Sequence, residues 1–448
     1  MIARVAAELA RAGVQAEAIE SKCALFEVVA TTLRAGLGRE SEMALWVPGR
    51  LEVFGKHTDY AGGRTLIATV PRGFAMAVAP RADGEIHVID AKSGERALIN
   101  TRTGERSPFG WARYIAIVAE RLGRNFPGAS LGLDIALISD LPRAAGASSS
   151  SALTVGCAMA MVRCGGLDQR PEWSESITSP IDLAGYLACI ENGMTFGRLE
   201  GGGGVGTFSG SEDHTAMICA KAGLMSAYAF VPVRHVEDAA LPETWSFVVA
   251  SSGVPAEKAG AAQALYNRAS LSARGLLEIW NDTHRHEISL AAALASGSGA
   301  SEELRAVLSQ AASVPGRFPW TAADLDRRLA HFVAEDGRVP DAVSAFRAAD
   351  AARLSELAAA SQRDADTLLG NQIPETNDLA TLARANGAWA SCAFGAGFGG
   401  SVWALVSRAD AQAFGEEWMR AYRHRHPGRT AATWFAARPG PAMTEVRG

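Results

Sequence analysis

The chain has 448 residues, enough for two or more domains, because single hydrophobic cores rarely grow past about 250–300 residues. Hydrophobic residues make up 48% of it and charged residues 20%, with a net charge of −5, which is ordinary globular composition. The sequence has neither a strongly basic stretch nor a run of about 18 apolar residues, so we expect no nucleic acid and no membrane as partners.

The six cysteines form no CxxC pair, and most have apolar neighbours, which favours buried free thiols in a reducing compartment. The first twenty residues read as an amphipathic helix and lack the uninterrupted apolar core of a signal peptide. We therefore expect a cytoplasmic protein.

The first half of the chain begins with a helix and continues with strand signals. Apolar and alternating patterns predict a strand that begins at 44–47, a long strand over 65–78 and, after a turn, a third strand over 85–90. We expect these strands to form an antiparallel meander. Helical periodicity then predicts a helix over 111–122, and a further strand is expected over 133–138.

The middle of the chain alternates between the two element types. A run of small and apolar residues over 148–162 predicts a buried helix, and 183–192 predicts a second one. Residues 217–231 have strand character, and 245–250 predict a short buried strand that opens a second domain. The segment GGGGVG at 201–206 is read as a flexible loop.

The second half is mostly helical from 256 to 369. Helical sequence is expected to precede a glycine loop at 395–400, and a strand to follow it over 402–406. A final helix and a strand over 432–436 complete an α+β pattern, in which helices and strands do not strictly alternate.

A cluster of polar residues follows the first strand, in the segment PGRLEVFGKHTDYAGG at 48–63. Its turn holds Lys56, His57 and Asp59, whose hydrogen-bonding groups suit a polyhydroxylated ligand. Arg50 adds a fixed positive charge. A surface hairpin turn explains the same residues, and the segment alone does not decide between the two.

The segment SDLPRAAGASSSSA at 139–152 joins a predicted strand to a predicted helix. Free N–H groups at a helix N-terminus form an anion site, and serine hydroxyls add donors and one oxygen ligand for Mg²⁺. The alternative is a helix cap, but a single serine would suffice for that.

A glycine-rich segment, FGAGFGGS at 394–401, formally matches GxGxxG. A dinucleotide fingerprint lies between a strand and a helix, whereas here a strand follows, so the match is weak. A loop whose backbone approaches a phosphate or a neighbouring loop fits better. The sequence contains no GxxxxGK[ST] motif, so any kinase chemistry is of another class.

In this order, the three segments resemble the signatures of the GHMP kinase superfamily, and most of all those of the galactokinases. The resemblance extends over nearly the whole chain, since 211–217 is similar to the family's MDQF stretch, 265–268 to YNxRR and 328–335 to RARHVVxE. It implies an α+β fold of two domains, 1–240 and 241–448, with the active site in the cleft between them.

The resemblance also implies roles for single residues. Asp213 would accept or orient the proton of a sugar's anomeric hydroxyl, and Arg50 would stabilise that aspartate and the transferring phosphoryl group. Ser150 and Glu191 would hold Mg²⁺. The remaining assignments are His57, Asp59 and Tyr266 for sugar hydroxyls, and Gly146, Ala147, Ser148, Ser149 and Ser150 for the phosphates of ATP.

Each of these residues also has a structural reading. Asp213 can be a helix cap, Glu191 a solvated helix residue and Tyr266 a core residue. Without the resemblance, the structural readings would be preferred for all three.

The turn departs from the family pattern at Lys56, which stands where the family has a glutamate, and at Glu52, which stands for an asparagine. A lysine reverses the charge and removes an acceptor, so it can favour an acidic sugar such as a uronic acid. Lys56 can equally pair with a nearby acid such as Glu52. Both readings stay open, and Lys56 is kept among the substrate-binding candidates.

Further departures concern the phosphate side and the loop before Asp213. Ala144 and Ala145 replace glycines, which would tighten the approach of a phosphate and affect ATP affinity. His214 replaces a glutamine, and the stretch between Glu191 and Asp213 is longer than usual, which would allow a mobile lid.

We expect a sugar kinase that transfers the γ-phosphate of MgATP to the C1 hydroxyl of galactose or a related sugar, as a monomer or weak homo-oligomer. A sugar-1-kinase for another substrate, such as a uronic acid, is the nearest alternative. The alternative from another class is a sugar-sensing protein that has lost catalysis. The presence of Arg50, Asp213, Ser150 and Glu191 argues against a sensor.

Overall fold

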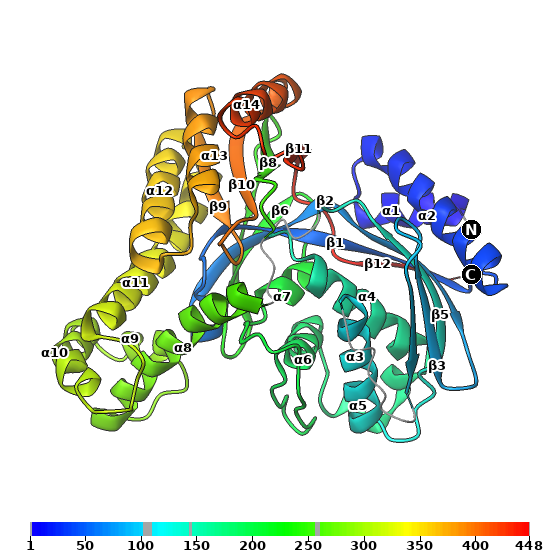
Figure 1. Ribbon diagram of the computed structural model, residues 1–448, viewed down its shortest axis with the longest axis horizontal. Coiled ribbons are helices and arrows are strands. Elements are labelled where there is room, and N and C mark those ends of the chain that lie inside the picture. Colours follow the sequence, from blue (N-terminus) through cyan, green and yellow to red (C-terminus); the bar gives the residue numbers. More distant parts are fainter. Residues whose placement is uncertain (1, 102–109, 143–145, 256–259, 448) are drawn as a thin grey trace.

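The computed structural model describes residues 2–101, 110–142, 146–255 and 260–447, and its strands form two sheets flanked by helices (Figure 1). The first sheet is eight-stranded, with the order β12-β1-β2-β5-β3-β4 and with β6 joining β2 to β7. Its strands are β1 Met43–Phe54, β2 Arg64–Pro80, β3 Glu85–Asp90, β4 Arg96–Asn100, β5 Leu133–Ser139, β6 Leu224–Ala229, β7 Arg234–Ala240 and β12 Thr444–Arg447. The α+β fold class is thereby confirmed.

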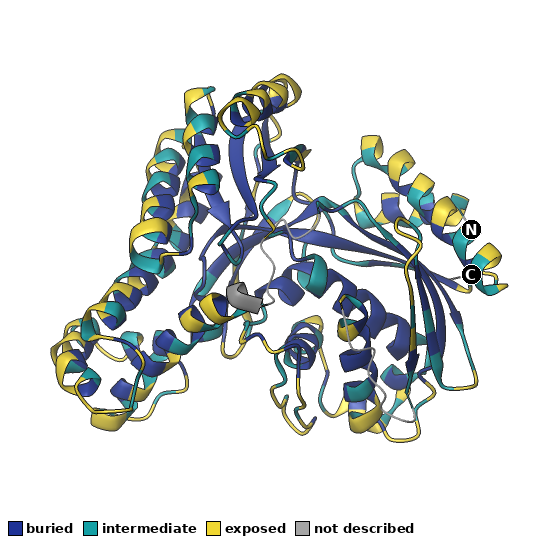
Figure 2. Ribbon diagram, in the orientation of Figure 1, coloured by how far each residue is buried: buried dark blue, intermediate teal, exposed yellow. Residues whose placement is uncertain are grey.

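Helices cover both faces of this sheet, with α1 and α2 on one side and α3, α4, α6 and α7 on the other (Figure 1). Their bounds are α1 Ile2–Ala12, α2 Ala16–Leu37, α3 Ala112–Asn125, α4 Ser149–Cys164, α5 Pro171–Ser174, α6 Pro180–Asn192 and α7 Glu212–Cys219. Figure 2 shows that the strands between these layers are buried over most of their length.

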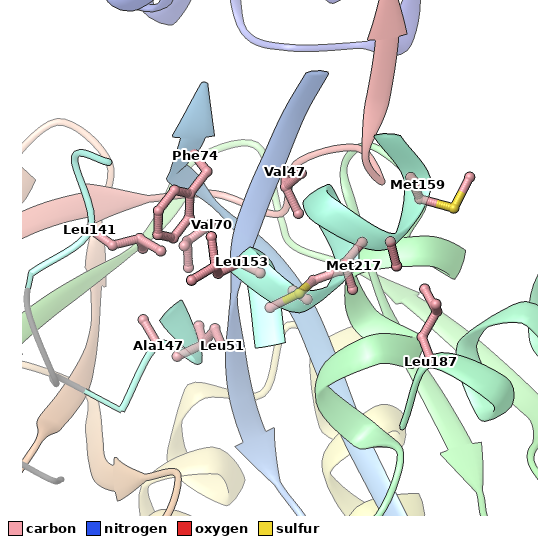
Figure 3. Packing of buried hydrophobic residues seen from close by; sticks show 14 of the residues in the cluster. Val47, Leu51, Val70, Phe74, Leu141, Ala147, Leu153, Met159, Leu187 and Met217 are labelled. Atoms are coloured by element: carbon pink, nitrogen blue, oxygen red, sulfur yellow. The ribbon is translucent and has the colours of Figure 1, made fainter. Parts of the chain in front are cut away.

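The alternation of side chains along the strands explains this layering. On β1, Leu45 and Val47 belong to the core under α3 and α4, whereas Trp46 packs in the cluster formed with α1 and α2. Successive side chains of a strand point to opposite faces, so a strand covered on both sides is apolar throughout. Figure 3 shows Val47 and Phe74 from the strands packed with Leu153 of α4 and Met217 of α7.

The second sheet is antiparallel and four-stranded, with the order β11-β8-β10-β9. Its strands are β8 Trp245–Ser251, β9 Ala390–Phe394, β10 Ser401–Ser407 and β11 Thr433–Ala437. The helices of this half are α8 Gly260–Thr283, α9 Leu290–Ala295, α10 Ala300–Ala312, α11 Ala322–Arg347, α12 Ala351–Asp364, α13 Pro374–Ala385 and α14 Ala411–Arg425. Helices α13 and α14 cover one face of the sheet.

The other face of the second sheet belongs to the same hydrophobic core as the first sheet. The rings of Phe54, at the end of β1, and Trp403, on β10, lie 5.9 Å apart, and Phe247 on β8 lies 5.7 Å from Trp403. This shared core fixes the end of β1 beside the hairpin formed by β9 and β10. The polar turn after β1 and the glycine loop of the hairpin are therefore brought together.

Three sequence predictions are wrong in detail. The expected meander is interrupted, because β5 lies between β2 and β3 and pairs with β3 in parallel. Residues 217–219 belong to helix α7 rather than to a strand. Strand β9, not a helix, leads into the glycine loop at 395–400. The first error arises because strand pairing depends on distant residues, and the other two because short apolar runs do not distinguish a strand from a buried helix.

The predicted domain boundary, between residues 240 and 241, falls between β7 of the first sheet and β8 of the second. The last strand crosses back, since β12 pairs antiparallel with β1, with Ala44 opposite Val446. Residues 444–447 therefore join the first sheet, although the sequence assigned them to the second domain. No helix in the described part of the chain is both long and apolar enough to span a membrane.

Candidate active site

A polar pocket lies where the turn after β1, the start of α7, helix α8 and the β9–β10 hairpin meet. Its lining comes from both sides of residue 240, in agreement with the predicted cleft. The lining residues are Arg50, Glu52, His57, Asp59, Tyr60, Ser209, Gly210, Glu212, Asp213, Tyr266, Gly395 and Ala396.

The centre of the pocket is the pair of Arg50 and Asp213. Arg50 is only 4% exposed, and its Nε lies 2.6 Å from Oδ1 of Asp213 and 3.1 Å from Oε1 of Glu212. Its guanidinium also donates to the carbonyl of Gly146. Burial lowers the pKa of Arg50, but the carboxylates of Asp213, Glu212 and Glu52 outweigh it and raise that pKa above its usual value. Arg50 is thus a fixed positive charge in a site shielded from water.

Asp213 lies in the first turn of α7, but it does not cap that helix. The N-cap is Ser211, and no side chain caps there. The carboxylate accepts hydrogen bonds at Oδ2 from Ser148 and, at 3.2 Å, from Ser151. These bonds leave the carboxylate between the start of α4 and Arg50. The capping alternative is therefore not favoured, and Ser151 is a partner that the sequence did not single out.

The serine-rich segment leads into α4 as predicted. Ser148 has a left-handed backbone with φ of 57°, and Ser149 and Ser150 form the first turn of the helix, half-buried. The first N–H groups of a helix have no intrahelical acceptor, so Gly146 to Ser150 can bind an anion here. The departures at Ala144 and Ala145 lie outside the described residues.

The glycine loop of the β9–β10 hairpin packs directly on this segment. Gly146 has φ of 75° and Gly395 φ of 78°. A Cβ atom on Gly395 would lie 2.8 Å from the carbonyl oxygen of Gly146, which is too close without a shift of the backbone. The third glycine segment thus serves the close approach of two loops, as the sequence favoured over a dinucleotide fingerprint.

The turn after β1 presents His57 and Asp59 to the pocket. His57 contacts the Tyr60 hydroxyl through Nδ1 at 2.9 Å and the Ala396 carbonyl through Nε2 at 3.2 Å. Asp59 accepts the backbone N–H of Glu212 at 3.2 Å. Burial, the largest cause, and nearby Asp213 raise the pKa of Asp59 to about 6.

Tyr266 of α8 closes the pocket on the side of the second half. Its ring lies 5.4 Å from that of His57, and it is 8% exposed. Burial and the carboxylates of Asp59 and Asp213 raise the pKa of Tyr266 well above 10, so its hydroxyl stays protonated and can donate a hydrogen bond. The structure thus brings His57, Asp59 and Tyr266 together as the sequence predicted.

A second pair of acids, Glu52 and Glu212, was not predicted to meet. Glu52 is 3% exposed, and its Oε2 accepts the N–H of Gly395 at 2.7 Å. Burial and the charge of Glu52 raise the pKa of Glu212 well above its usual value, and burial also raises the pKa of Glu52. The two acids come from distant segments, so only the fold reveals that they share the pocket with Asp59 and Asp213.

Lys56, in contrast, does not line this pocket. It is 1% exposed, and its Nζ lies 2.6 Å from Ser361 Oγ, 3.0 Å from Cys392 Sγ and 3.7 Å from Glu335 Oε1. The structure therefore favours the reading in which Lys56 pairs with an acid, although the acid is Glu335 and not Glu52. A contact between Lys56 and a substrate carboxylate is not favoured.

The two predicted Mg²⁺ ligands, Ser150 and Glu191, lie on helices α4 and α6, which pack on one another. Glu191 is 1% exposed, so it is no solvated helix residue, and its Oε2 lies 3.2 Å from Nε2 of His214. A hydroxyl and a carboxylate are the oxygen donors that Mg²⁺ accepts alongside water and phosphate. The residues present therefore fit the ion, although no group of three or more acidic, histidine or cysteine ligands occurs among the described residues.

Comparison with known families finds three matches along the chain. Residues 113–195 match the GHMP kinases N terminal domain and 342–424 the GHMP kinases C terminal domain. Residues 35–80, which contain the polar turn, match the galactokinase galactose-binding signature. The order of these matches follows the order of the segments that form the pocket.

Relatives named galactokinase span most of the chain. The galactokinase of Roseiflexus sp. (strain RS-1) is 28% identical and covers 86% of this chain and 89% of its own length. The galactokinase of Halalkalibacterium halodurans is 25% identical, and the match covers 90% of this chain and 92% of that protein.

Solved structures share the fold. The Lactococcus lactis galactokinase complexed with galactose superposes with a TM-score of 0.71 at 20% identity, covering 93% of this chain and 98% of that one. The Methanococcus jannaschii mevalonate kinase superposes with a TM-score of 0.54 at 13% identity, and the superposition covers 90% of this chain and 99% of that one. Together with the family matches and the relatives, these similarities indicate a galactokinase-like, ATP-dependent sugar kinase that carries the GHMP kinase N- and C-terminal domains and the galactokinase galactose-binding signature.

Proposed function

We propose that this chain transfers the γ-phosphate of ATP to the anomeric C1 hydroxyl of galactose or of a closely related neutral sugar. The observation that carries the proposal is the buried pair of Arg50 and Asp213, with 2.6 Å between Nε and Oδ1, at the N-terminus of α4. This arrangement supports the proposal because phosphoryl transfer needs a proton acceptor, a fixed cation and hydrogen-bond donors for the phosphates, and a carboxylate, a guanidinium and a helix N-terminus lie close together here.

In the proposed reaction the C1 oxygen forms a bond to the γ-phosphorus while the bond from that phosphorus to the β,γ-bridging oxygen breaks. Asp213 orients the sugar hydroxyl and receives its proton, and ADP leaves. Arg50 and the N–H groups from Gly146 to Ser150 stabilise the charge on the transferring group. When bound, Mg²⁺ would neutralise phosphate charge, with Ser150 and Glu191 as its protein ligands.

The charge of the pocket supports a neutral sugar over a uronic acid. Among the described lining residues, Glu52, Asp59, Glu212 and Asp213 are acids, and Arg50 is already paired with two of them. A substrate carboxylate would meet like charges and would find Lys56 out of reach. Galactose hydroxyls, in contrast, can donate to these acceptors.

The first test is an ADP-release assay with MgATP and a panel of hexoses, pentoses, N-acetylhexosamines and uronic acids. We expect turnover with galactose and none with galacturonate. Turnover with uronic acids alone would contradict the proposal. If calorimetry detected sugar binding but no sugar of the panel were phosphorylated, the second candidate, a sugar-sensing protein without catalysis, would be favoured instead. The observation behind this candidate is that alanines replace two glycines of the family pattern at 144 and 145.

The raised pKa of Asp59 predicts a pH dependence of sugar binding. The carboxylate accepts charge-assisted hydrogen bonds from hydroxyls at both oxygens, and below its pKa of about 6 it becomes neutral, so one oxygen carries a proton and the remaining bonds are weaker. Between pH 7 and pH 5 we expect KM for galactose to rise about tenfold, as the ionised fraction falls. In the variant Asp59→Asn, KM should be high at every pH. A wild-type KM that stays constant over this range would remove Asp59 from the sugar site.

A further inference from the structure

A second and larger cavity adjoins the polar pocket. Its volume is about 480 Å³, compared with about 30 Å³ for the polar pocket, and it lies between α6, α8 and the turn that joins β6 to β7. The two share Asp59, Tyr60, Ser209 and Gly210 as lining residues. Ligand cavities of proteins commonly have volumes of about 300–1,000 Å³. Most of the free space beside the sugar site is therefore in this second cavity.

The lining of this cavity is largely apolar. Met194, Phe208, Val231 and Ile288 are among the large apolar side chains that the protein exposes, with 56%, 38%, 40% and 64% exposure, and all four lie on this cavity. Single exposed apolar residues are common on protein surfaces, but a group around one cavity indicates a ligand.

Besides Asp59, the charged residues of the lining are Asp182 and Arg274, and each has a contact within the protein. Asp182 accepts hydrogen bonds from the hydroxyls of Thr178 and Ser179 at 2.7 and 2.9 Å, within the cap of α6. The guanidinium of Arg274 lies over the ring of Phe208, 5.5 Å from its centroid. Apolar side chains make up the larger part of the cavity surface, and polar groups the smaller part.

The position of the cavity relative to Asp213 restricts its occupant. Asp213 lines only the polar pocket, whereas Asp59 lines both. The reacting hydroxyl must lie at Asp213, so a group in the cavity would extend from another position of the same sugar ring, past Asp59 and Gly210. A second sugar ring would bring many hydroxyl groups against an apolar lining, where unpaired polar groups are costly.

We propose that this cavity binds an apolar substituent, an alkyl or acyl chain, that the sugar substrate carries at a position other than the reacting hydroxyl. The inference rests on the proposed function, because it takes the polar pocket as the site of the sugar ring. It assigns the natural substrate to the class of sugars with an apolar substituent.

Galactose ethers test this proposal. Methyl and hexyl ethers at O2, O3, O4 and O6 leave the anomeric hydroxyl free, and each pair differs only in chain length. Burial of one methylene group lowers a dissociation constant about fourfold. For at least one ring position, we expect the hexyl ether to bind at least about tenfold more tightly than the methyl ether, in calorimetry without ATP and in KM. A gain below about tenfold at all four positions overturns the proposal.

Charges at the mouth of the cavity provide the matched variants. Met194 and Ile288 are exposed, so the double variant Met194→Glu/Ile288→Glu should fold. In this variant the gain, which is the affinity of the hexyl ether divided by that of the methyl ether, should fall to less than about threefold. Leu98→Glu, at a residue of β4 with 59% exposure outside the cavity, should keep the gain. An undiminished gain in the double variant would also overturn the proposal.

The two proposals fail in different ways. If the calorimetric gain appears but no sugar is phosphorylated, the cavity is supported and the kinase assignment fails. If galactose is phosphorylated and chain length has no effect, the kinase assignment holds and the cavity proposal fails.

Discussion

Replacement of Asp213 by alanine is expected to lower kcat for sugar phosphorylation by at least about 10³-fold, because general base catalysis and orientation of the attacking hydroxyl are lost together. The fold should persist, since the buried guanidinium of Arg50 keeps Glu212 as a partner at 3.1 Å and the carbonyl of Gly146 as an acceptor. ADP release and circular dichroism of the same preparation measure the two effects.

The matched control for this variant is Asp326→Ala. The Asp326 side chain is 53% exposed and pairs with Arg305 at the surface, so its loss should change neither kcat nor stability by much. If Asp213→Ala kept kcat within about tenfold of the wild type, Asp213 would not be the catalytic residue. Calorimetric titration with galactose would then show whether Asp213 contributes to binding alone.

Replacement of Lys56 by glutamate is expected to lower the free energy of unfolding by about 3–5 kcal/mol, the usual cost of breaking a buried ion pair. The new carboxylate would lie beside Glu335, which is buried, with 0% exposure. Burial alone would raise the pKa of Glu335, but Lys56, His331 and Arg338 lower it to about 2, so this acid is charged at neutral pH. In the variant the lowering effect of Lys56 on that pKa is lost, so the two buried acids either repel each other or take up a proton, and both outcomes cost stability.

Chemical denaturation measures this loss, and two further variants identify its cause. Lys56→Met should cost less, because Glu335 keeps Arg338 at 2.7 Å and Ser361 at 2.8 Å. The exchange Lys56→Glu/Glu335→Lys should recover part of the stability. If Lys56→Glu were as stable as the wild type and changed the preference among sugars, Lys56 would belong to the sugar pocket after all.

The direction in which the Lys56 side chain points could not have been predicted from the sequence. It lies between Gly55, with φ of 100°, and His57, with φ of 58°, so neither strand nor helix periodicity describes where its side chain points. A Cβ atom on Gly55 would lie 2.4 Å from the carbonyl oxygen of Arg64, which shows how closely the turn folds back on β2. This backbone turns His57 toward the pocket and Lys56 into the core.

The meeting of Glu52 with Glu212 also escaped prediction. Each was visible in the sequence, Glu52 as a departure from the family pattern, but their proximity depends on the packing of α7 against β1 and β2. The same holds for Ser151, which is one residue past the predicted phosphate segment and still bonds to Asp213. The structure explains this contact, since Ser148 immediately precedes α4 and its hydroxyl donates to that of Ser151 at 3.0 Å, so both hydroxyls lie beside the same carboxylate oxygen of Asp213.

The sequence by itself determined the chemistry of the separate segments. Glycines and serines before a predicted helix indicate an anion site, because backbone freedom and side-chain donors belong to each segment alone. The sugar kinase followed from the resemblance of the three segments, in their order, to the galactokinase signatures. Only the tertiary structure decided which of these groups face one another. Strand partners, the buried pair of Lys56 with Glu335 and the apolar cavity beside Asp59 arise from contacts between distant segments, which no local pattern contains.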